Sequence, residues 1–338
     1  MGLGDRLRAT PADRDFARAV EAGLDEVEVQ LLKQVEFADE IADVTTRYLL
    51  NAGGKRVRPM LTLLTSHLGD GITDDVITAA TAIEVTHLAS LYHDDVMDDA
   101  DKRRGVPSAQ TVWGNSVAIL AGDLLFARAS QLMAGLGEGA IRLQAATFER
   151  LVLGQLHETN GPKAGDDQVA HYIQVLADKT GSLIAAAAQS GVIFSNAPAE
   201  YEEPIVAYGE RIGIAFQLID DVIDLSPQPR KTGKVPGTDL RAGVVTLPLL
   251  RLRERAETDA ASARLLERLE AEVIGVETPS DTADVLIAEL RDHPVTAATR
   301  DEAHAWARHA VDALAVLPDG QVVKALTRFA DSIVERSS

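Results

Sequence analysis

Residues 73–98 read TDDVITAATAIEVTHLASLYHDDVMD, and this stretch decides the fold class. Its apolar residues recur at intervals of three and four, which is the spacing of one face of an α-helix. Gly105 and Pro107 follow a few residues later and indicate a loop. The stretch therefore predicts a long helix with one buried stripe, made of Val76, Ile77, Ala80, Ile83, Leu88, Leu91 and Tyr92.

The predicted helix ends in an acidic pattern that occurs twice, as Asp94-Asp95-Val96-Met97-Asp98 and as Asp220-Asp221-Val222-Ile223-Asp224. In a helix the outer aspartates of each copy share one face, about 5–6 Å apart. Carboxylate oxygens suit Mg²⁺, whose coordination is often completed by water and substrate phosphates. A solvated acidic face would explain one cluster, but two copies favour a cation site. Both copies are expected at a helix C-terminus, where the helix dipole disfavours negative charge, and such conflicts are typical of functional sites.

The three- and four-residue spacing continues along the chain without a convincing run of strict alternation, so the sequence predicts an all-α protein. No low-complexity linker or repeat divides it, and residues 1–338 are expected to form a single domain, with residues 1–14 disordered. Further helices are predicted at 15–50, 57–69, 115–137, 139–159, 167–195, 200–216, 241–256, 258–275, 281–292, 299–316 and 320–336.

Composition limits the possible partners. The chain of 338 residues has a formal net charge of −19, so a nucleic acid would be repelled and is excluded. The absence of cysteine excludes disulfides, thiolate metal sites and cysteine nucleophiles. The N-terminal segment lacks the apolar core of a signal peptide, and the apolar stretches at 117–137 and 181–194 are interrupted by charge or too short to span a membrane. We therefore expect a cytoplasmic protein.

Basic residues lie close to the acidic patterns. Lys55, Arg56 and Arg58 follow a glycine pair just before a predicted helix start, where free backbone N–H groups favour anions such as a diphosphate. His87 lies seven residues before the first motif and on the same helical stripe, although a buried core histidine is the alternative interpretation. Other candidates by position are Arg103, Arg104, Lys179 and Gln217.

The loop at 226–240 combines prolines and glycines with Lys231 and Lys234. Glycine permits close backbone approach and lysine attracts phosphate, which suits a flap that closes over an anionic ligand. An ordinary surface loop is the alternative.

Five motifs in a fixed order carry a family resemblance: GGKRVRP at 53–59, HDDVMDDADKRRG at 93–105, KTGSL at 179–183, FQLIDDVID at 216–224 and GKVPGTDLRAGVVTLP at 233–248. Together they resemble the trans-type polyprenyl diphosphate synthase family, of the long-chain type. The resemblance implies a helical bundle of the isoprenoid synthase type, with the two aspartate motifs facing one another across the mouth of a central cavity.

The resemblance also implies an enzyme, a prenyltransferase that elongates an allylic diphosphate, such as farnesyl or geranylgeranyl diphosphate, with isopentenyl diphosphate and releases diphosphate. Breaking the allylic carbon–oxygen bond leaves negative charge on diphosphate, which metals and cations stabilise in the transition state. Mg²⁺, as three ions when diphosphate is bound, would be held by Asp94, Asp95, Asp98, Asp220, Asp221 and Asp224.

Further roles follow residue by residue from the resemblance. Arg103, Lys179, Gln217 and Lys234 would bind the allylic diphosphate, and Lys55, Arg58, His87 and Arg104 would bind isopentenyl diphosphate. Oxygens of Thr180 and Gln217 would stabilise the carbocation. The implied catalytic set is Asp94, Asp95, Asp98, Lys179, Thr180, Gln217, Asp220 and Lys234. One departure is Val244, where the family often has lysine, so one cation fewer is expected at the allylic diphosphate.

Product length is expected to depend on the residues that precede the first motif. In the family a bulky residue four or five positions before the first aspartate stops growth, whereas this chain has Ala89 and Ser90 there, and Thr86 one turn earlier. The implied product is a medium or long chain of about C35–C50, with nonaprenyl as the best single expectation, because side chains one and two turns before the motif would line the cavity wall. A short-chain synthase, making about C15–C20, is the alternative function. The alternative interpretation of the small residues is that they only pack and that the floor lies deeper, on the helix at 117–136.

Two other functions are considered. A terpene cyclase shares the first aspartate motif, but the GGKRVRP cluster is not expected there and its second motif differs. A non-catalytic subunit of a heteromeric synthase would be expected to have lost one aspartate motif, and both are intact here. The family resemblance favours a homodimer, and contact with membranes is expected to be transient, for product release, because the acidic surface offers no anchor to anionic lipid.

Overall fold

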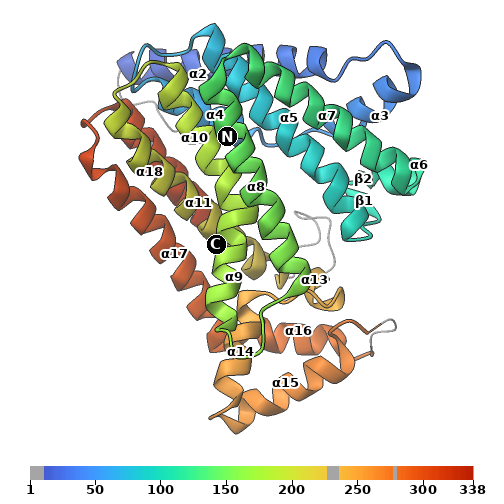
Figure 1. Cartoon of the computed structure of the whole chain (residues 1–338). Coiled ribbons are helices and arrows are strands. Elements are labelled where there is room, and N and C mark those ends of the chain that lie inside the picture. The colour runs from blue at the N-terminus through green and yellow to red at the C-terminus, as the bar shows by residue number, and fades with distance from the viewer. Residues whose placement is uncertain (1–10, 227–235, 277–279, 338) are drawn as a thin grey trace. The chain divides into compact units, whose positions relative to one another are not determined.

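The computed structural model of the chain describes residues 11–226, 236–276 and 280–337, and they are almost entirely helical (Figure 1). The all-α prediction is confirmed. The first part contains α2 (Pro11–Gln34), α3 (Glu40–Asn51), α4 (Val57–Ser66), α5 (Asp74–Met97), β1 (Lys102–Arg103), β2 (Val106–Pro107), α6 (Ala109–Trp113), α7 (Asn115–Gly135) and α8 (Glu138–Asn160). The remainder contains α9 (Gln168–Leu176), η1 (Ala177–Gly181), α10 (Ser182–Phe194), η2 (Ala199–Tyr201), α11 (Glu202–Asp224), α13 (Thr238–Arg241), α14 (Leu247–Ala256), α15 (Ala260–Glu272), α16 (Ala283–Asp292), α17 (Pro294–Ala313), η3 (Leu314–Val316), α18 (Gln321–Val334) and η4 (Glu335–Ser337).

The chain divides into two compact units. The first comprises Met1–Glu149, Leu183–Gly209 and Ala313–Leu326, and the second comprises Arg150–Ser182, Glu210–Asp312 and Thr327–Ser338. The expected single domain and central cavity therefore stay predictions. Of the segment expected to be disordered, residues 1–10 lie outside the described residues, and α2 already begins at Pro11.

The first unit is organised around α5. This helix packs along α7 and also contacts α4 and α2, as Figure 1 shows for α5 and α7. The predicted stripe is buried apart from the half-buried Leu91, but Ala79, Ala82 and Val85 are buried as well. A helix that is apolar on all sides is a core helix, so the expectation of a single stripe was too narrow.

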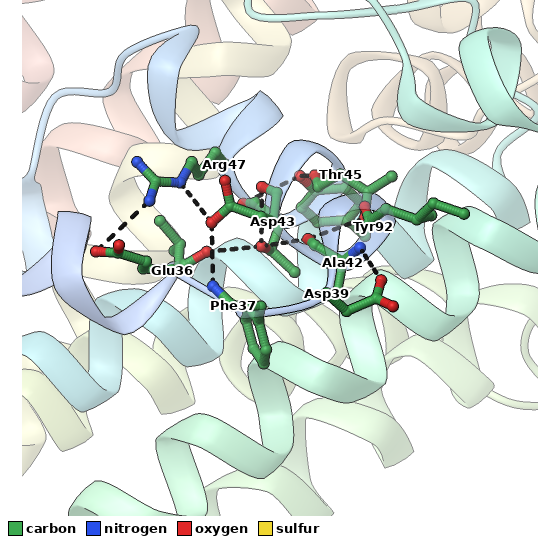
Figure 2. Close-up of polar contacts among 11 residues, drawn as sticks. Glu36, Phe37, Asp39, Ala42, Asp43, Thr45, Arg47 and Tyr92 are labelled. Atoms are coloured by element: carbon green, nitrogen blue, oxygen red, sulfur yellow. Dashed lines mark hydrogen bonds and ion pairs between the residues drawn. The ribbon is translucent and has the colours of Figure 1, made fainter.

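The predicted helix at 15–50 is two helices, α2 and α3, because the chain turns at residues 35–39. Asp39 caps α3 by accepting a hydrogen bond from the Ala42 N–H, and Asp43 accepts one from the Phe37 N–H (Figure 2). Arg47 holds Asp43 through an ion pair of 2.8 Å. The hydroxyl of Tyr92 donates to the Thr45 carbonyl and so joins α5 to α3.

The second unit contains a separate apolar cluster formed by α14, α15 and α16. Leu252, Leu269, Leu286 and Leu290 are buried in it. The predicted helix at 241–256 begins only at Leu247, after a turn in which Gly243 has a φ of +79°. The predicted helix at 167–195 is likewise not regular, since a π-helical turn, η1, separates α9 from α10.

By length and composition α7 is the one helix of the described part that could cross a membrane, and a third of its most apolar window is buried. Asp123 and Arg128 interrupt it, and it packs against α5 in the first unit.

Candidate active site

The first aspartate motif ends α5 as predicted, and its three carboxylates differ in environment. Asp94 is half-buried, Asp95 is buried, and Asp98 is exposed and forms the C-cap. Burial raises the pKa of Asp95, although the Arg103 guanidinium opposes this shift. Arg103 Nε donates to Asp95 Oδ1 at 2.6 Å, whereas Oδ2 is buried and accepts no hydrogen bond from the described residues. Asp95 therefore retains one oxygen that a cation could bind.

A short hairpin returns Arg103 to the motif. Strands β1 and β2 pair antiparallel around Arg104 and Gly105, which both have positive φ, 52° and 82°. Two such residues form the tight turn that suits the twist of a two-stranded hairpin. Arg104 takes the first strained position of the turn, where glycine or asparagine is usual. Its Nη1 donates a hydrogen bond to the Leu49 carbonyl at 2.7 Å.

Three arginines and one histidine of the first unit gather in a basic cluster, which comprises Arg56, Arg58, His87 and Arg104. A side chain at Gly54 would meet both Arg56 and Arg104, so these two guanidiniums converge on that glycine. Arg58 Nε is buried without a hydrogen-bond partner among the described residues. Lys55 is exposed beside the cluster. The arrangement offers donors and positive charge to an anion.

The counter-charge of the basic cluster is Glu84, which is 3% exposed. Burial raises the pKa of Glu84, while Arg58, Arg56 and Arg104 oppose the shift. Arg56 lies 3.4 Å from Glu84 Oε1 and also forms two hydrogen bonds with Glu28. Burial, together with the neighbouring guanidiniums, holds the pKa of His87 well below 6.5, so its imidazole is neutral at pH 7.

The second aspartate motif ends α11, again as predicted, and belongs to the second unit. Asp220 pairs with Arg336 at 3.1 Å, and the Arg336 guanidinium also lies 4.8 Å from the Phe216 ring centroid. Asp221 is buried, and burial raises its pKa to about 8. Asp224 Oδ2 accepts a hydrogen bond from the Asp239 N–H, and its carbonyl accepts one from Gly237.

Lys179 and Thr180 lie in the π-turn η1, a feature often found at functional sites. The turn packs against glycines: a Cβ at Gly154 would lie 2.6 Å from Lys179 N, and one at Gly213 would lie 2.5 Å from Gly181 Cα. Backbone therefore approaches backbone closely on two sides of η1. Lys179 pairs with Glu158 of α8.

The other predicted residues are placed as follows. Gln217 is half-buried in α11, one turn before Asp221. Thr86, Ala89 and Ser90 are buried in α5, and Ala89 O and the His93 ring lie against Gly122 of α7. Lys231 and Lys234 lie outside the described residues, as does most of the expected flap.

The sequence did not indicate three residues that contact the candidate site. Glu84 faces the basic cluster, Arg336 pairs with Asp220, and Tyr172 donates a hydrogen bond to Asp221. Glu84 could have been noticed as a lone carboxylate inside an apolar helix. Tyr172 and Arg336 gave no signal, because their partners lie 49 and 116 positions away. Among the described residues, no three His, Asp or Glu side chains already converge as a metal site.

Comparison with solved structures identifies the class to which this fold belongs. A decaprenyl diphosphate synthase from Rhodobacter capsulatus matches with a TM-score of 0.84 and 31% identity over 97% of this chain and all of that one. A geranylgeranyl pyrophosphate synthase from Corynebacterium glutamicum, complexed with calcium and isoprenyl diphosphate, matches with a TM-score of 0.84 and 37% identity over 98% and 99%. The fold is that of the all-α isoprenyl diphosphate synthases.

Sequence comparison gives the family. The polyprenyl synthetase model matches residues 39–278. A nonaprenyl diphosphate synthase of Mycobacterium tuberculosis is 43% identical over 327 residues, 96% of this chain and 95% of the relative. An octaprenyl diphosphate synthase of Haemophilus influenzae is 33% identical over 86% and 87%. The chain belongs to the polyprenyl synthetase family and is an enzyme of the prenyltransferase class, which confirms the expected family and activity class.

Proposed function

We propose that the protein elongates an allylic diphosphate, such as farnesyl or geranylgeranyl diphosphate, with isopentenyl diphosphate to an all-trans polyprenyl diphosphate, releasing diphosphate. The basic cluster beside the first aspartate motif carries the proposal. Arg58 Nε is buried there without a partner among the described residues, and a diphosphate oxygen would supply one through a charge-assisted hydrogen bond. Lys55, Arg58, His87 and Arg104 are the proposed ligands of isopentenyl diphosphate.

We assign Mg²⁺ to the two aspartate motifs, with three ions when diphosphate is bound. The donor set is entirely carboxylate and includes the buried, unbonded Oδ2 of Asp95, which fits a hard cation. The calcium and isoprenyl diphosphate in the related Corynebacterium glutamicum and Caulobacter crescentus structures support the assignment. When bound, the metal supplies positive charge to the leaving diphosphate. The proposed ligands are Asp94, Asp95, Asp98, Asp220, Asp221 and Asp224.

The protein's own cations share that task. Arg103, Lys179 and Lys234, with Gln217, are proposed to bind the allylic diphosphate and to stabilise the charge that grows as the carbon–oxygen bond breaks. Side-chain oxygens of Thr180 and Gln217 would stabilise the carbocation. The double bond of isopentenyl diphosphate then attacks the cation, and the released diphosphate accepts the proton. Val244, 45% exposed, offers no charge where the family often has lysine.

The proposed product is a medium or long chain of about C35–C50, with nonaprenyl as the best single choice, because Ala89 and Ser90 are small side chains one turn before Asp94. The nonaprenyl, octaprenyl and decaprenyl synthases among the relatives support this length. A short-chain product is the second candidate, since the geranylgeranyl synthase of Corynebacterium glutamicum also matches.

A homodimer is proposed from exposed apolar side chains on α6, α7 and α8 of the first unit, which would together form one interface. Leu120 is 61% exposed, and neighbouring apolar side chains are at least one third exposed. The other members of the proposed interface are Val112, Ile119, Leu124, Ile141 and Phe148. A second copy of the chain would cover them. We also propose a cytoplasmic location, with transient membrane contact to release the apolar product.

The test is incubation of the purified protein with Mg²⁺, farnesyl diphosphate and labelled isopentenyl diphosphate. Labelled polyprenyl diphosphate is expected without any added partner protein. Asp220→Asn should lower incorporation about a hundredfold or more, as for loss of a group that stabilises transition-state charge. Asp99→Asn is the matched control, because Asp99 is exposed and lies outside the motif spacing. Absence of elongation would favour a non-catalytic subunit, and a cyclic product would favour a terpene cyclase.

A further inference from the structure

Asp221 is bound by two elements besides its own helix. The Tyr172 hydroxyl of α9 donates to Asp221 Oδ2 at 2.8 Å, and the Leu247 N–H donates to the same oxygen at 3.2 Å. Leu247 is the first residue of α14, where backbone N–H groups lack helical partners. One buried carboxylate oxygen therefore joins the second aspartate motif to α9 and to the start of α14.

The position of Tyr172 distinguishes this contact from an ordinary buried tyrosine. Tyr172 precedes Lys179 by seven residues, about two helical turns. The segment formed by α9 and η1 therefore carries both the contact with Asp221 and Lys179, a proposed ligand of the allylic diphosphate. Tyr208 is a comparable buried tyrosine of the first unit, and its hydroxyl donates to a backbone carbonyl, that of Leu326. The Tyr172 hydroxyl, by contrast, donates to the carboxylate of an aspartate in the second motif.

We propose that Tyr172 is a positioning residue for the second aspartate motif, which holds Asp221 in place and thereby sets the affinity of this motif for metal-bound diphosphate. The inference rests on the proposed function, which assigns metal to that motif. Hydrogen-bond partners of metal-site carboxylates fix their orientation, and losing one typically costs about 10–100-fold in metal affinity. Loss of the Tyr172 hydroxyl leaves Asp221 Oδ2 with the Leu247 N–H alone.

The experiment is calorimetric titration of Mg²⁺ together with inorganic diphosphate into the full-length protein, which needs no turnover. Tyr172→Phe is expected to weaken binding about tenfold and to raise the half-saturating Mg²⁺ concentration in the elongation assay. The KM for isopentenyl diphosphate should stay within about twofold, because the residue that Tyr172 contacts, Asp221, is not one of the proposed ligands of isopentenyl diphosphate. Tyr208→Phe removes a comparable buried hydroxyl and should leave the Mg²⁺ dependence unchanged.

A double-mutant cycle tests whether Tyr172 acts through Asp221. On an Asp221→Asn background, Tyr172→Phe should cause less than a twofold further loss of binding, since the carboxylate it positions is already gone. Additive losses, or wild-type binding by Tyr172→Phe, would overturn the inference. If wild-type protein binds Mg²⁺ with diphosphate and Asp220→Asn does not, the proposed function stands in either case. If the wild type binds none, the assignment of metal is itself wrong.

Discussion

The carboxylate of Glu84 shows how much a single residue decides in the basic cluster. It is a buried carboxylate next to Arg56, Arg58 and Arg104, and these guanidiniums reduce the cost of its burial, although burial still raises its pKa. The cluster still has excess positive charge, because His87 is neutral and three arginines face two carboxylates, Glu84 and Glu28. A bound diphosphate would neutralise the positive charge that these carboxylates leave uncompensated.

At the residue scale, short motifs in the sequence indicated members of the basic cluster, whose roles as ligands stay predictions. GGKRVRP and the RRG segment contain Arg58 and Arg104, and the structure brings both into one cluster with His87. Tyr172 was missed because its phenol is an ordinary core side chain until the fold places Asp221 beside it. The sequence therefore indicated which residues belong to the basic cluster, but it did not indicate which residues far apart in the chain pair with one another.

Ser90→Phe is predicted to shorten the product sharply while leaving the rate of the first condensation within about threefold, since Ser90 is 7% exposed and lies one turn before Asp94. Ser90→Ala is the matched control and should not change product length. Chromatography of the dephosphorylated products measures both. Ser90 is a better test position than Ala89, whose carbonyl lies against Gly122 and leaves less room for helix movement. An unchanged chain length in an active Ser90→Phe variant would show that the tail passes elsewhere.

At the scale of elements, helix type and the ends of α5 and α11 were predictable, because periodicity and the aspartate motifs mark them. The division of 15–50 into α2 and α3 was not, because the turn contains neither glycine nor proline and depends on side-chain caps by Asp39 and Asp43. The π-turn at Lys179 was also not predictable, since apolar periodicity continues through it. Its cause lies in neighbouring helices, at Gly154 and Gly213.

Gly213→Ala is predicted to lower the free energy of unfolding by about 1–3 kcal/mol and to lower kcat, because its Cβ would lie 2.5 Å from Gly181 Cα and would push η1 away. Gly139→Ala is the control: nothing lies within 4 Å of a Cβ there, and alanine favours a helix. Denaturant unfolding and steady-state kinetics measure the two effects. Equal stability of Gly213→Ala and wild type would contradict this account of the π-turn.

At the scale of the whole molecule, the residues from 115 to 159 are apolar over more than one helix face, a pattern compatible with a deep core as well as with an interface. The structure places Leu120 and Ile119 at the surface of the first unit, where a core explanation no longer applies to them. Which apolar side chains of α7 are exposed depends on which face of α7 packs against α5. Because α7 is apolar on several sides, the periodicity of its sequence does not identify that face.

Leu120→Lys is predicted to shift the protein from about twice the chain mass of 36.1 kDa to the monomer mass at micromolar concentration. A lysine would place an uncompensated charge in the proposed interface. Val316→Lys is the control, since Val316 is 71% exposed and is not a member of the proposed interface. Light scattering after size-exclusion chromatography measures both masses. A monomeric wild type, or a dimeric Leu120→Lys variant, would contradict the proposed interface.

The ion pair between Arg336 and Asp220 has a practical consequence for anyone who produces this enzyme. Because Arg336 contacts Asp220, a tag inserted directly after Arg336 would begin next to the second aspartate motif. A polyhistidine tag there would bring metal-chelating groups to an assay that depends on metal. Metal-dependent kinetics should therefore be measured only after such a tag has been removed.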